Sequence, residues 1–196
     1  MSFVLKEVTA LWPKLNRTYR FDSAEMRSVP CDPKADGAEY TVNVEMSPEQ
    51  AKELHKYCKE AWDTFAKKNP GAEFENKPYK KNEQGLVVAK LKLKGAYNGE
   101  PTRKPRQFDA SNNLLPDDFE LTTGSTINVQ VQAIPYATKM AQGVSLRLGA
   151  VQVVELAEGN VSSPFGEVDG GFKGGNKPFG EIEKPKADSF EDDIPF

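Results

Sequence analysis

The chain has 196 residues, a formal net charge of −3 at pH 7 and 28% charged residues. This length predicts one domain of ordinary size with an appendage, and it is short for two full domains. The charge balance excludes a strongly basic composition of the kind that marks many DNA-binding proteins, so the distribution of charge along the chain is more informative than its sum.

Two strands are predicted in the first quarter of the chain. Residues 3–12 mix apolar and polar positions as a strand does, and we expect this strand to end in a turn at Pro13. Residues 40–46 alternate strictly between apolar and polar side chains, which is the period of a half-buried strand.

A helix is predicted over about residues 47–68. Ser47 and Gln50 have the spacing of a capping box, and Pro48 suits the first helical position. Apolar residues then recur at spacings of three and four, and an Asn-Pro-Gly sequence ends the helix. His55 lies off this apolar face, so we expect a solvated histidine rather than a catalytic or ligand-binding one.

Residues 79–94 predict a hairpin that turns around residues 82–85 and continues into a long strand. On that strand the apolar side chains point one way and three lysines point the other. Further strands are predicted at 106–110, 126–136 and 143–156, the last with a bulge or bend at Gly149. Five or more antiparallel strands with one helix predict a mainly β fold built as a small barrel.

The acidity of the chain is concentrated at its C-terminal end. Residues 160–196 contain eight acids and four lysines, which leaves a net charge of about +1 for the rest. Six glycines and four prolines leave this segment too few apolar groups to offset the entropy of ordering. We therefore predict a folded domain over 1–159 and a disordered tail over 160–196.

The lysines of the long strand belong to a larger group of cations and aromatic residues. A single row of lysines on a strand is most often a solvated sheet face, but aromatic rings among cations are what single-stranded nucleic acid requires, since bases stack on rings and phosphates bind cations. Trp12, Tyr79 and Tyr97 are predicted as exposed stacking platforms, Trp62 as a packing residue, and Phe108 and Tyr136 equally as stacking or core residues. The candidate DNA-binding residues are Trp12, Lys14, Tyr79, Lys80, Lys81, Lys90, Lys92, Lys94, Tyr97, Arg103, Lys104, Arg106 and Tyr136.

No set of residues has the pattern of an active site. The chain has one histidine, no nucleophile motif and no Cys/His spacing typical of a metal site. We therefore expect neither catalysis nor a cofactor or metal. The two cysteines, Cys31 and Cys58, are expected to be reduced in the cytoplasm, because no signal-peptide pattern or membrane-spanning apolar run accompanies them.

The last residues, "EDDIPF", combine clustered acids with two apolar side chains. This pattern is typical of a tethered peptide ligand, in which Ile194 and Phe196 anchor in a small pocket and the carboxylates meet a basic rim. The predicted protein-interaction tip consists of Asp188, Phe190, Glu191, Asp192, Asp193, Ile194, Pro195 and Phe196.

The sequence "DDIPF" after a Gly-rich segment resembles the C-terminal tip of bacterial single-stranded-DNA-binding proteins. The segments "LWPKL" (11–15) and "GVSLRLGAVQVVEL" (143–156) are similar to segments of phage single-stranded-DNA-binding proteins. The resemblance implies a five-stranded OB-fold barrel that coats single-stranded DNA without sequence preference during phage replication, recombination and repair in the bacterial host cytoplasm. It also implies that the tip recruits replication and recombination proteins such as a polymerase, helicase, primase or nuclease. The helix at 47–68 departs from the bacterial pattern.

Two other functions remain open from the sequence: a replication adaptor whose body binds protein, and a recombination protein that anneals complementary strands. A DNA-mimicking decoy is disfavoured because the acids cluster only in the tail. A flexible tail of 37 residues reaches about 30–36 Å, so it can also fold back on a basic face and compete with DNA. The oligomeric state is not readable from the sequence.

Overall fold

The protein is described by a computed structural model over residues 2–158. The predicted tail and its tip lie outside these residues. The elements are, in chain order, β1 (Phe3–Asp22), β2 (Arg27–Pro30), β3 (Glu39–Met46), α1 (Pro48–Ala66), β4 (Tyr79–Lys81), β5 (Val87–Lys94), β6 (Ala96–Tyr97), β7 (Glu100–Pro101), β8 (Gln107–Phe108), β9 (Thr126–Ala137) and β10 (Gln142–Glu155).

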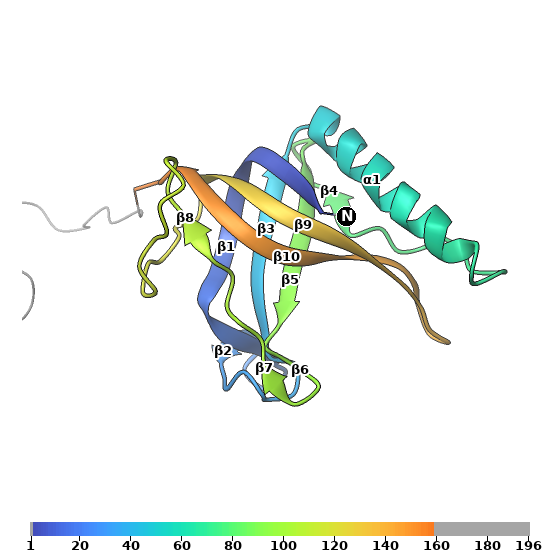
Figure 1. Ribbon diagram of the computed structural model, residues 1–196, viewed down its shortest axis with the longest axis horizontal. Coiled ribbons are helices and arrows are strands. Elements are labelled where there is room, and N and C mark those ends of the chain that lie inside the picture. The colour runs from blue at the N-terminus through green and yellow to red at the C-terminus, as the bar shows by residue number, and fades with distance from the viewer. Residues whose placement is uncertain (1, 159–196) are drawn as a thin grey trace, which may run out of the picture. The chain divides into compact units, whose positions relative to one another are not determined.

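Five of the strands form a closed barrel in the order β5, β3, β1, β9 and β10. Neighbours along this path are antiparallel, and the parallel pairing of β10 with β5, at Leu146 and Leu91, closes the barrel. Figure 1 shows β9 and β10 crossing in front of β1, β3 and β5. This is the five-stranded arrangement of the OB fold, so the predicted fold class is confirmed.

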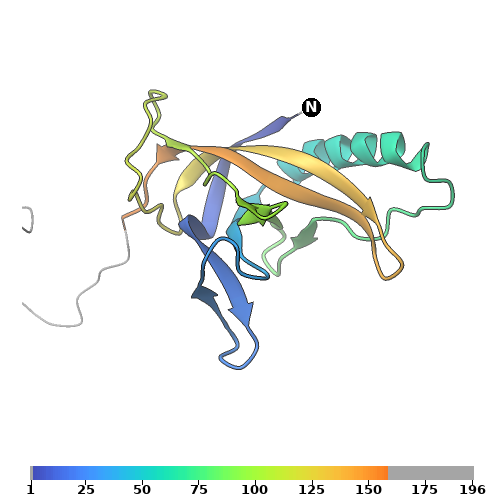
Figure 2. The same cartoon turned by 60° about the horizontal axis from the view of Figure 1, so that its bottom comes forward.

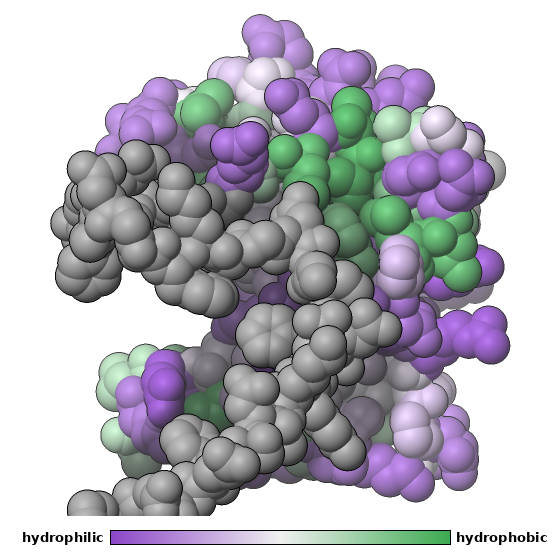
Figure 3. Space-filling view, turned by 90° about the vertical axis from the view of Figure 1, so that its left-hand side faces the viewer, coloured by the Kyte–Doolittle hydropathy of each residue, from purple (hydrophilic) through white to green (hydrophobic). Residues whose placement is uncertain are grey.

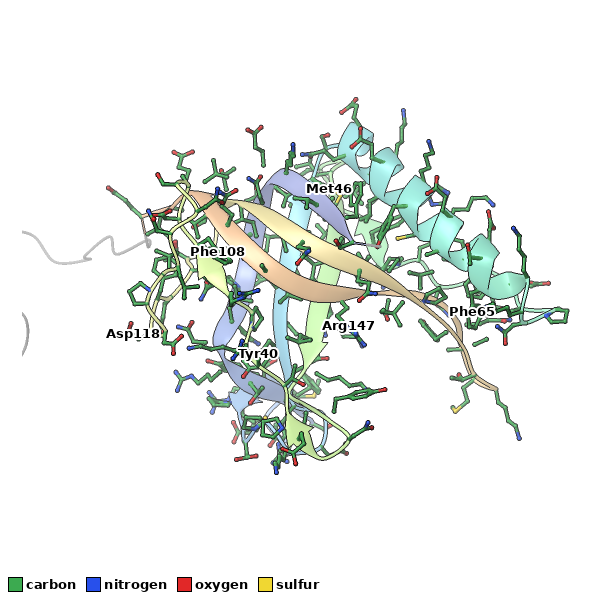
Figure 4. The ribbon with its side chains drawn as sticks, viewed as in Figure 1. Tyr40, Met46, Phe65, Phe108, Asp118 and Arg147 are labelled. Carbon is green, nitrogen blue, oxygen red and sulfur yellow. The ribbon has the colours of Figure 1, made fainter. Side chains whose placement is uncertain are left out.

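The barrel interior is filled by alternate residues of its strands. Val42, Leu91 and Leu146 are each at most 1% exposed, and they lie on three different strands. Tyr40 and Met46, also buried, lie at opposite ends of β3 (Figure 4). The predicted alternation of 40–46 is therefore confirmed.

Helix α1 covers one end of the barrel and begins as its sequence predicts. Ser47 and Gln50 form the capping box, and Leu54 and Cys58 are fully buried. Burial raises the pKa of the Cys58 thiol to about 12, so this thiol stays protonated at neutral pH. Within residues 2–158 no helix has the length and apolarity needed to cross a membrane.

The expectation of a solvated His55 is wrong. Its side chain is half-buried, its Nδ1 hydrogen-bonds the hydroxyl of Tyr79, and its ring stacks on Phe74 with centroids 6.3 Å apart. The segment between α1 and β4 packs back against the helix, so the buried face of α1 is wider than its apolar spacing indicated. Trp62, predicted to pack, is 4% exposed and stacks on Phe74 at 5.4 Å.

Strand β1 does not end at Pro13, as the sequence predicted, but continues to Asp22. Pro13 lies in a bulge between Leu11 and Lys14. Because residues in a bulge are not paired with the neighbouring strand, the N–H that proline lacks does not interrupt the ladder. Beyond the barrel, β1 pairs with β2, which was not predicted, and the two strands extend away from the barrel as a hairpin arm (Figure 2).

The other predicted strands are confirmed with small changes in their ends. The hairpin of β4 and β5 turns at residues 82–86, and the register of β10 against β9 shifts between Leu148 and Val151, where a bulge was expected at Gly149. The strand predicted at 106–110 is reduced to the two residues of β8, which pair in parallel with β10.

Replacing the helix residue that seals the barrel should destabilise the fold. Because Leu54 is 0% exposed, we expect Leu54→Ala to lower the free energy of unfolding by about 2–5 kcal/mol, measured by urea denaturation. Lys52→Ala, on the exposed side of the same helix, is the control and should change it by less than about 0.5 kcal/mol. Equal effects of the two changes would show that α1 does not complete the core.

Candidate nucleic-acid interface

The predicted lysines lie on the outward side of β5. Lys90, Lys92 and Lys94 are all exposed, whereas Ala89 and Leu91, on the opposite side of the strand, are buried in the barrel. Strand β3 lies beside β5 over eight consecutive residue pairs, so its outward side chains continue the same surface. The alternation predicted for this strand is confirmed.

Cross-strand pairing arranges this surface in rows that run from β1 over β3 to β5. Adjacent strands are about 4.8 Å apart and alternate residues along a strand are about 6.6 Å apart, which sets the spacing of the rows. The rows are Leu11, Asn43 and Lys90; then Lys14, Thr41, Lys92 and Arg147; then Tyr19, Glu39 and Lys94. We call the cations of these rows, Lys14, Lys90, Lys92, Lys94 and Arg147, the cationic face.

Arg147 belongs to the cationic face although the sequence did not single it out. It is exposed on β10, directly opposite Lys92 of β5, and lies where the two strands meet (Figure 4). From the sequence alone, only the alternation of apolar and polar residues in β10 indicates that Arg147 is exposed. The parallel pairing that brings it to Lys92 joins residues 55 positions apart and leaves no local trace.

One carboxylate, Glu39, lies among these cations. Its Oε1 accepts from Nζ of Lys90 at 2.9 Å. Burial of the Lys14 ammonium lowers its pKa, repulsion from Lys90 lowers it further, and Glu39 partly offsets both effects. Lys14 and Lys90 are therefore close enough to repel one another, and a bound anion would relieve that repulsion.

The two lysines of β4 lie on different sides of the sheet. Lys80 pairs with Val88 and shares the side of Lys90, whereas Lys81 pairs with Val87 on the other side. Both are exposed. The structure therefore adds Lys80 to the edge of the cationic face and separates Lys81 from it.

Arg103, Lys104 and Arg106, which follow β7, lie outside the cationic face. Lys104 is held by Asp117, with its Nζ 3.0 Å from Oδ1 and 2.7 Å from the backbone oxygen. Arg106 lies over the ring of Phe108 at 5.9 Å, and its backbone oxygen accepts from Val151, four residues along β10 from Arg147. Arg103 is exposed in the loop. Arg106 is therefore about 13 Å along β10 from the cationic face.

Two of the predicted stacking residues are exposed as expected. Trp12 is 64% exposed in the bulge of β1, with a φ of 47° that bulky residues rarely adopt. Its backbone N–H donates to Oγ1 of Thr123 at 3.0 Å, which holds this conformation. Tyr97 is 65% exposed in the β6–β7 hairpin, three residues after Lys94.

Tyr79 is not the exposed platform that the sequence predicted. Its ring is half-buried against the core, burial raises its pKa, and its hydroxyl is bonded to His55. Tyr136 is half-buried on β9 and shares the outward side of Gln132, the residue paired with Arg147. Phe108 is half-buried beneath Arg106.

A second surface of different character lies around β8. Figure 3 shows the side of the molecule that carries β8, with hydrophobic residues grouped among hydrophilic ones. An open hollow of about 250 Å³ there is lined by Val4, Phe108 and Ala150 and by amide side chains that bond one another, as Asn128 does with Gln152 at 2.8 Å. Across residues 2–158 no group of three or more His, Cys, Asp or Glu residues could hold a metal ion.

No known family model and no curated protein matches this sequence. Solved structures do match the fold. A single-stranded DNA-binding protein from bacteriophage Enc34, in complex with ssDNA, is similar with a TM-score of 0.59 and 12% identity, over 81% of this chain and 89% of that chain. The gp2.5 single-stranded DNA-binding protein encoded by bacteriophage T7 is similar with a TM-score of 0.58 and 18% identity, over 85% of this chain and 98% of that chain.

The chain has the fold of these phage proteins. The structural resemblance to phage single-stranded-DNA-binding proteins, which the sequence segments indicated, is therefore confirmed for the fold. In an OB fold the outward side of the second and third barrel strands binds oligonucleotides. Here those strands are β3 and β5, and β5 carries three of the five cations of the cationic face.

Removing the single acid of the rows should strengthen anion binding. In Glu39→Gln, Lys90 loses its ion pair and the cationic face gains one net positive charge, so we expect tighter binding of an oligothymidylate at low salt, measured by fluorescence anisotropy. Glu60→Gln on the exposed side of α1 makes the same charge change away from the face and should have little effect. Equal tightening by both variants would mean that only net charge matters.

Proposed function

We propose that this protein binds single-stranded DNA without sequence preference and coats it during phage DNA replication and recombination. The observation that carries the proposal is the cationic face: four lysines and one arginine from β1, β5 and β10, held in register on the outward side of an OB-fold barrel. The solved phage proteins with the same fold are named as single-stranded DNA-binding proteins, which supports the same ligand class here.

The cationic face acts on the phosphates of the strand. Each phosphate that a lysine or arginine neutralises releases a counterion, which contributes about 0.7 to the salt dependence of binding for single strands. Lys14 contributes in a second way. Burial lowers its pKa and repulsion from Lys90 lowers it further, and a phosphate between the two ammonium groups relieves that repulsion. These contacts go to the backbone of the strand and therefore do not read its sequence.

Exposed aromatic rings act on the bases. Trp12 lies in the bulge between Leu11 and Lys14, and Tyr97 follows the last lysine of β5. The two rings therefore border the cationic face on β1 and beyond the end of β5. Stacking on each contributes on the order of 1–3 kcal/mol per base whatever the base. Phosphate contacts and ring stacking together require an unpaired strand, and no catalytic step is part of this function.

The acidic segment outside the described residues has a separate role in the proposal. Its clustered acids followed by Ile194 and Phe196 have the composition of a peptide ligand for replication and recombination proteins such as a polymerase, helicase, primase or nuclease. Its charge is opposite to that of the cationic face, so it also competes with DNA phosphates. The proposed setting is the cytoplasm of a bacterial host.

A salt series on the purified chain tests the DNA-binding proposal. We expect oligothymidylate to bind and to quench tryptophan fluorescence, and Lys92→Ala to lower the slope of log affinity against log salt by about 0.7. Lys81→Ala removes the same charge from the other side of the sheet and should leave the slope unchanged. Absence of binding at low salt would refute the proposal and favour a protein-binding adaptor.

Removing residues 188–196 tests the role of the acidic segment. The truncated chain should bind oligothymidylate more tightly at low salt, because the competing carboxylates are gone, and it should lose binding to the host replication proteins that the full chain captures. The two chains should converge in affinity at high salt. Unchanged affinity at low salt would refute the competition between tail and DNA.

A further inference from the structure

The β6–β7 hairpin, which follows the last lysine of the cationic face, forms a small sheet outside the barrel. Its strands have two residues each, with Ala96 paired to Pro101 and Tyr97 paired to Glu100. A two-stranded hairpin of this kind is marginally stable in water by itself. We therefore expect the tip of the hairpin to open locally at a low cost in free energy.

The base of the hairpin, in contrast, is fixed to the barrel. The backbone N–H of Gly95 donates to the backbone oxygen of Ala38 at 2.7 Å, and the N–H of Thr102 donates to the backbone oxygen of Gly95 at 2.7 Å. A Cβ at Gly95 would lie 2.6 Å from the backbone oxygen of Pro33, so this close approach requires glycine. Because Lys94 directly precedes Gly95, the hairpin is held next to the cationic face.

The tip of the hairpin is an Asn-Gly turn. Asn98 and Gly99 have φ values of 51° and 81°, and a type I′ turn requires positive values at both of these positions. Asn-Gly is the sequence that such turns prefer, so the turn by itself accounts for both residues. The same pair occurs nowhere else in the 196 residues.

The two residues of this turn are open to solvent and to each other. Both are exposed, and a Cβ at Gly99 would meet no atom within 4 Å. Within residues 2–158 the side chain of Asn98 makes no hydrogen bond, whereas Oδ1 of Asn112 accepts from Nε2 of Gln152 at 2.8 Å. Cγ of Asn98 is therefore free to rotate toward the backbone nitrogen of Gly99, which no side chain shields.

We propose that Asn98 is a site of spontaneous deamidation, and that the negative charge created there weakens the binding of single-stranded DNA. The backbone nitrogen of Gly99 loses its proton to solvent and attacks Cγ of Asn98. The new N–Cγ bond closes a succinimide ring, and Nδ2 leaves as ammonia. Water then adds to one of the two ring carbonyl carbons and breaks its bond to the ring nitrogen, which leaves an aspartate or an isoaspartate at position 98.

The new carboxylate lies where the proposed function places DNA. Tyr97, an exposed ring next to position 98, pairs with Glu100, so the product has an acid on each side of the ring. Position 98 is also four residues from Lys94, which is at most about 13 Å and comparable to the Debye length of about 10 Å in about 0.1 M salt. The carboxylate therefore repels the phosphates that the lysine attracts. This effect on DNA rests on the proposed function, whereas the reaction itself does not.

Peptide mapping of the full-length protein tests the reaction. After incubation at mildly alkaline pH, mass spectrometry should find NH₂ replaced by OH in the Asn98 peptide at least about fivefold faster than in the peptide with Asn112 and Asn113, since only Asn98 precedes a glycine. The rate should rise with pH, because the attacking nitrogen must lose its proton. Equal rates in the two peptides would overturn the proposal.

Three variants test the effect on DNA by anisotropy with an oligothymidylate. Asn98→Asp should bind about two- to fivefold more weakly than the wild type at low salt, and the difference should vanish at high salt. Lys52→Gln makes the same change in net charge on the exposed side of α1 and should have little effect. Asn98→Gly keeps a type I′ turn but has no amide, so it should bind like the wild type and keep its affinity during the incubation that weakens the wild type.

Two outcomes of the binding experiment would contradict the proposal. Equal loss of affinity by incubated wild type and incubated Asn98→Gly would show that the change lies elsewhere in the chain. Equal weakening by Asn98→Asp and Lys52→Gln would show that only net charge matters. If fresh wild-type protein does not bind the oligomer, the proposed function itself fails, and the peptide map still decides whether Asn98 deamidates.

Discussion

The pairing of β3 with β5 is the constraint on which both the fold and the candidate site depend. Eight consecutive residue pairs, from Glu39 with Lys94 to Met46 with Val87, hold the strands in one register. A shift of one residue would turn the lysines into the barrel and expose Leu91. Because burial of the apolar side selects the register, core packing also places the ammonium groups in rows.

Strand β1 departs from regular strand geometry at several points, and these departures expose side chains that a regular strand would not. Trp12 and Glu7 both have positive φ values, and each backbone N–H is held by a side chain of a distant segment, Thr123 for Trp12 and Asn128 for Glu7. Such conformations are costly and persist only where the surroundings enforce them. Here they turn Trp12 toward solvent, and further along β1 a stretch with three more residues than the matching part of β3 borders a hollow beside Tyr19.

Repulsion among the cations of the cationic face destabilises the protein when no anion is bound. Burial lowers the pKa of Lys14 and repulsion from Lys90 lowers it further, and Glu39 moderates this repulsion through its contact with Lys90. In the proposed function, the phosphates of the bound strand take over this moderating role. The ion pair of Glu39 with Lys90 therefore lowers the electrostatic cost of the cationic face in the unbound protein.

The sequence by itself determined the features that depend on local periodicity: the capped helix, the alternating strands β3 and β5, the bend in β10 and the outward row of lysines. Four features could not be predicted from the sequence. Arg147 lies beside Lys92, and Tyr79 is buried against His55. Lys80 and Lys81 lie on opposite sides of the sheet, and β1 continues beyond Pro13. These outcomes were decided by the tertiary structure, because they depend on which distant strand becomes a neighbour and in what register. Hydrophobic burial over the whole barrel sets that choice, and no short stretch of sequence records it.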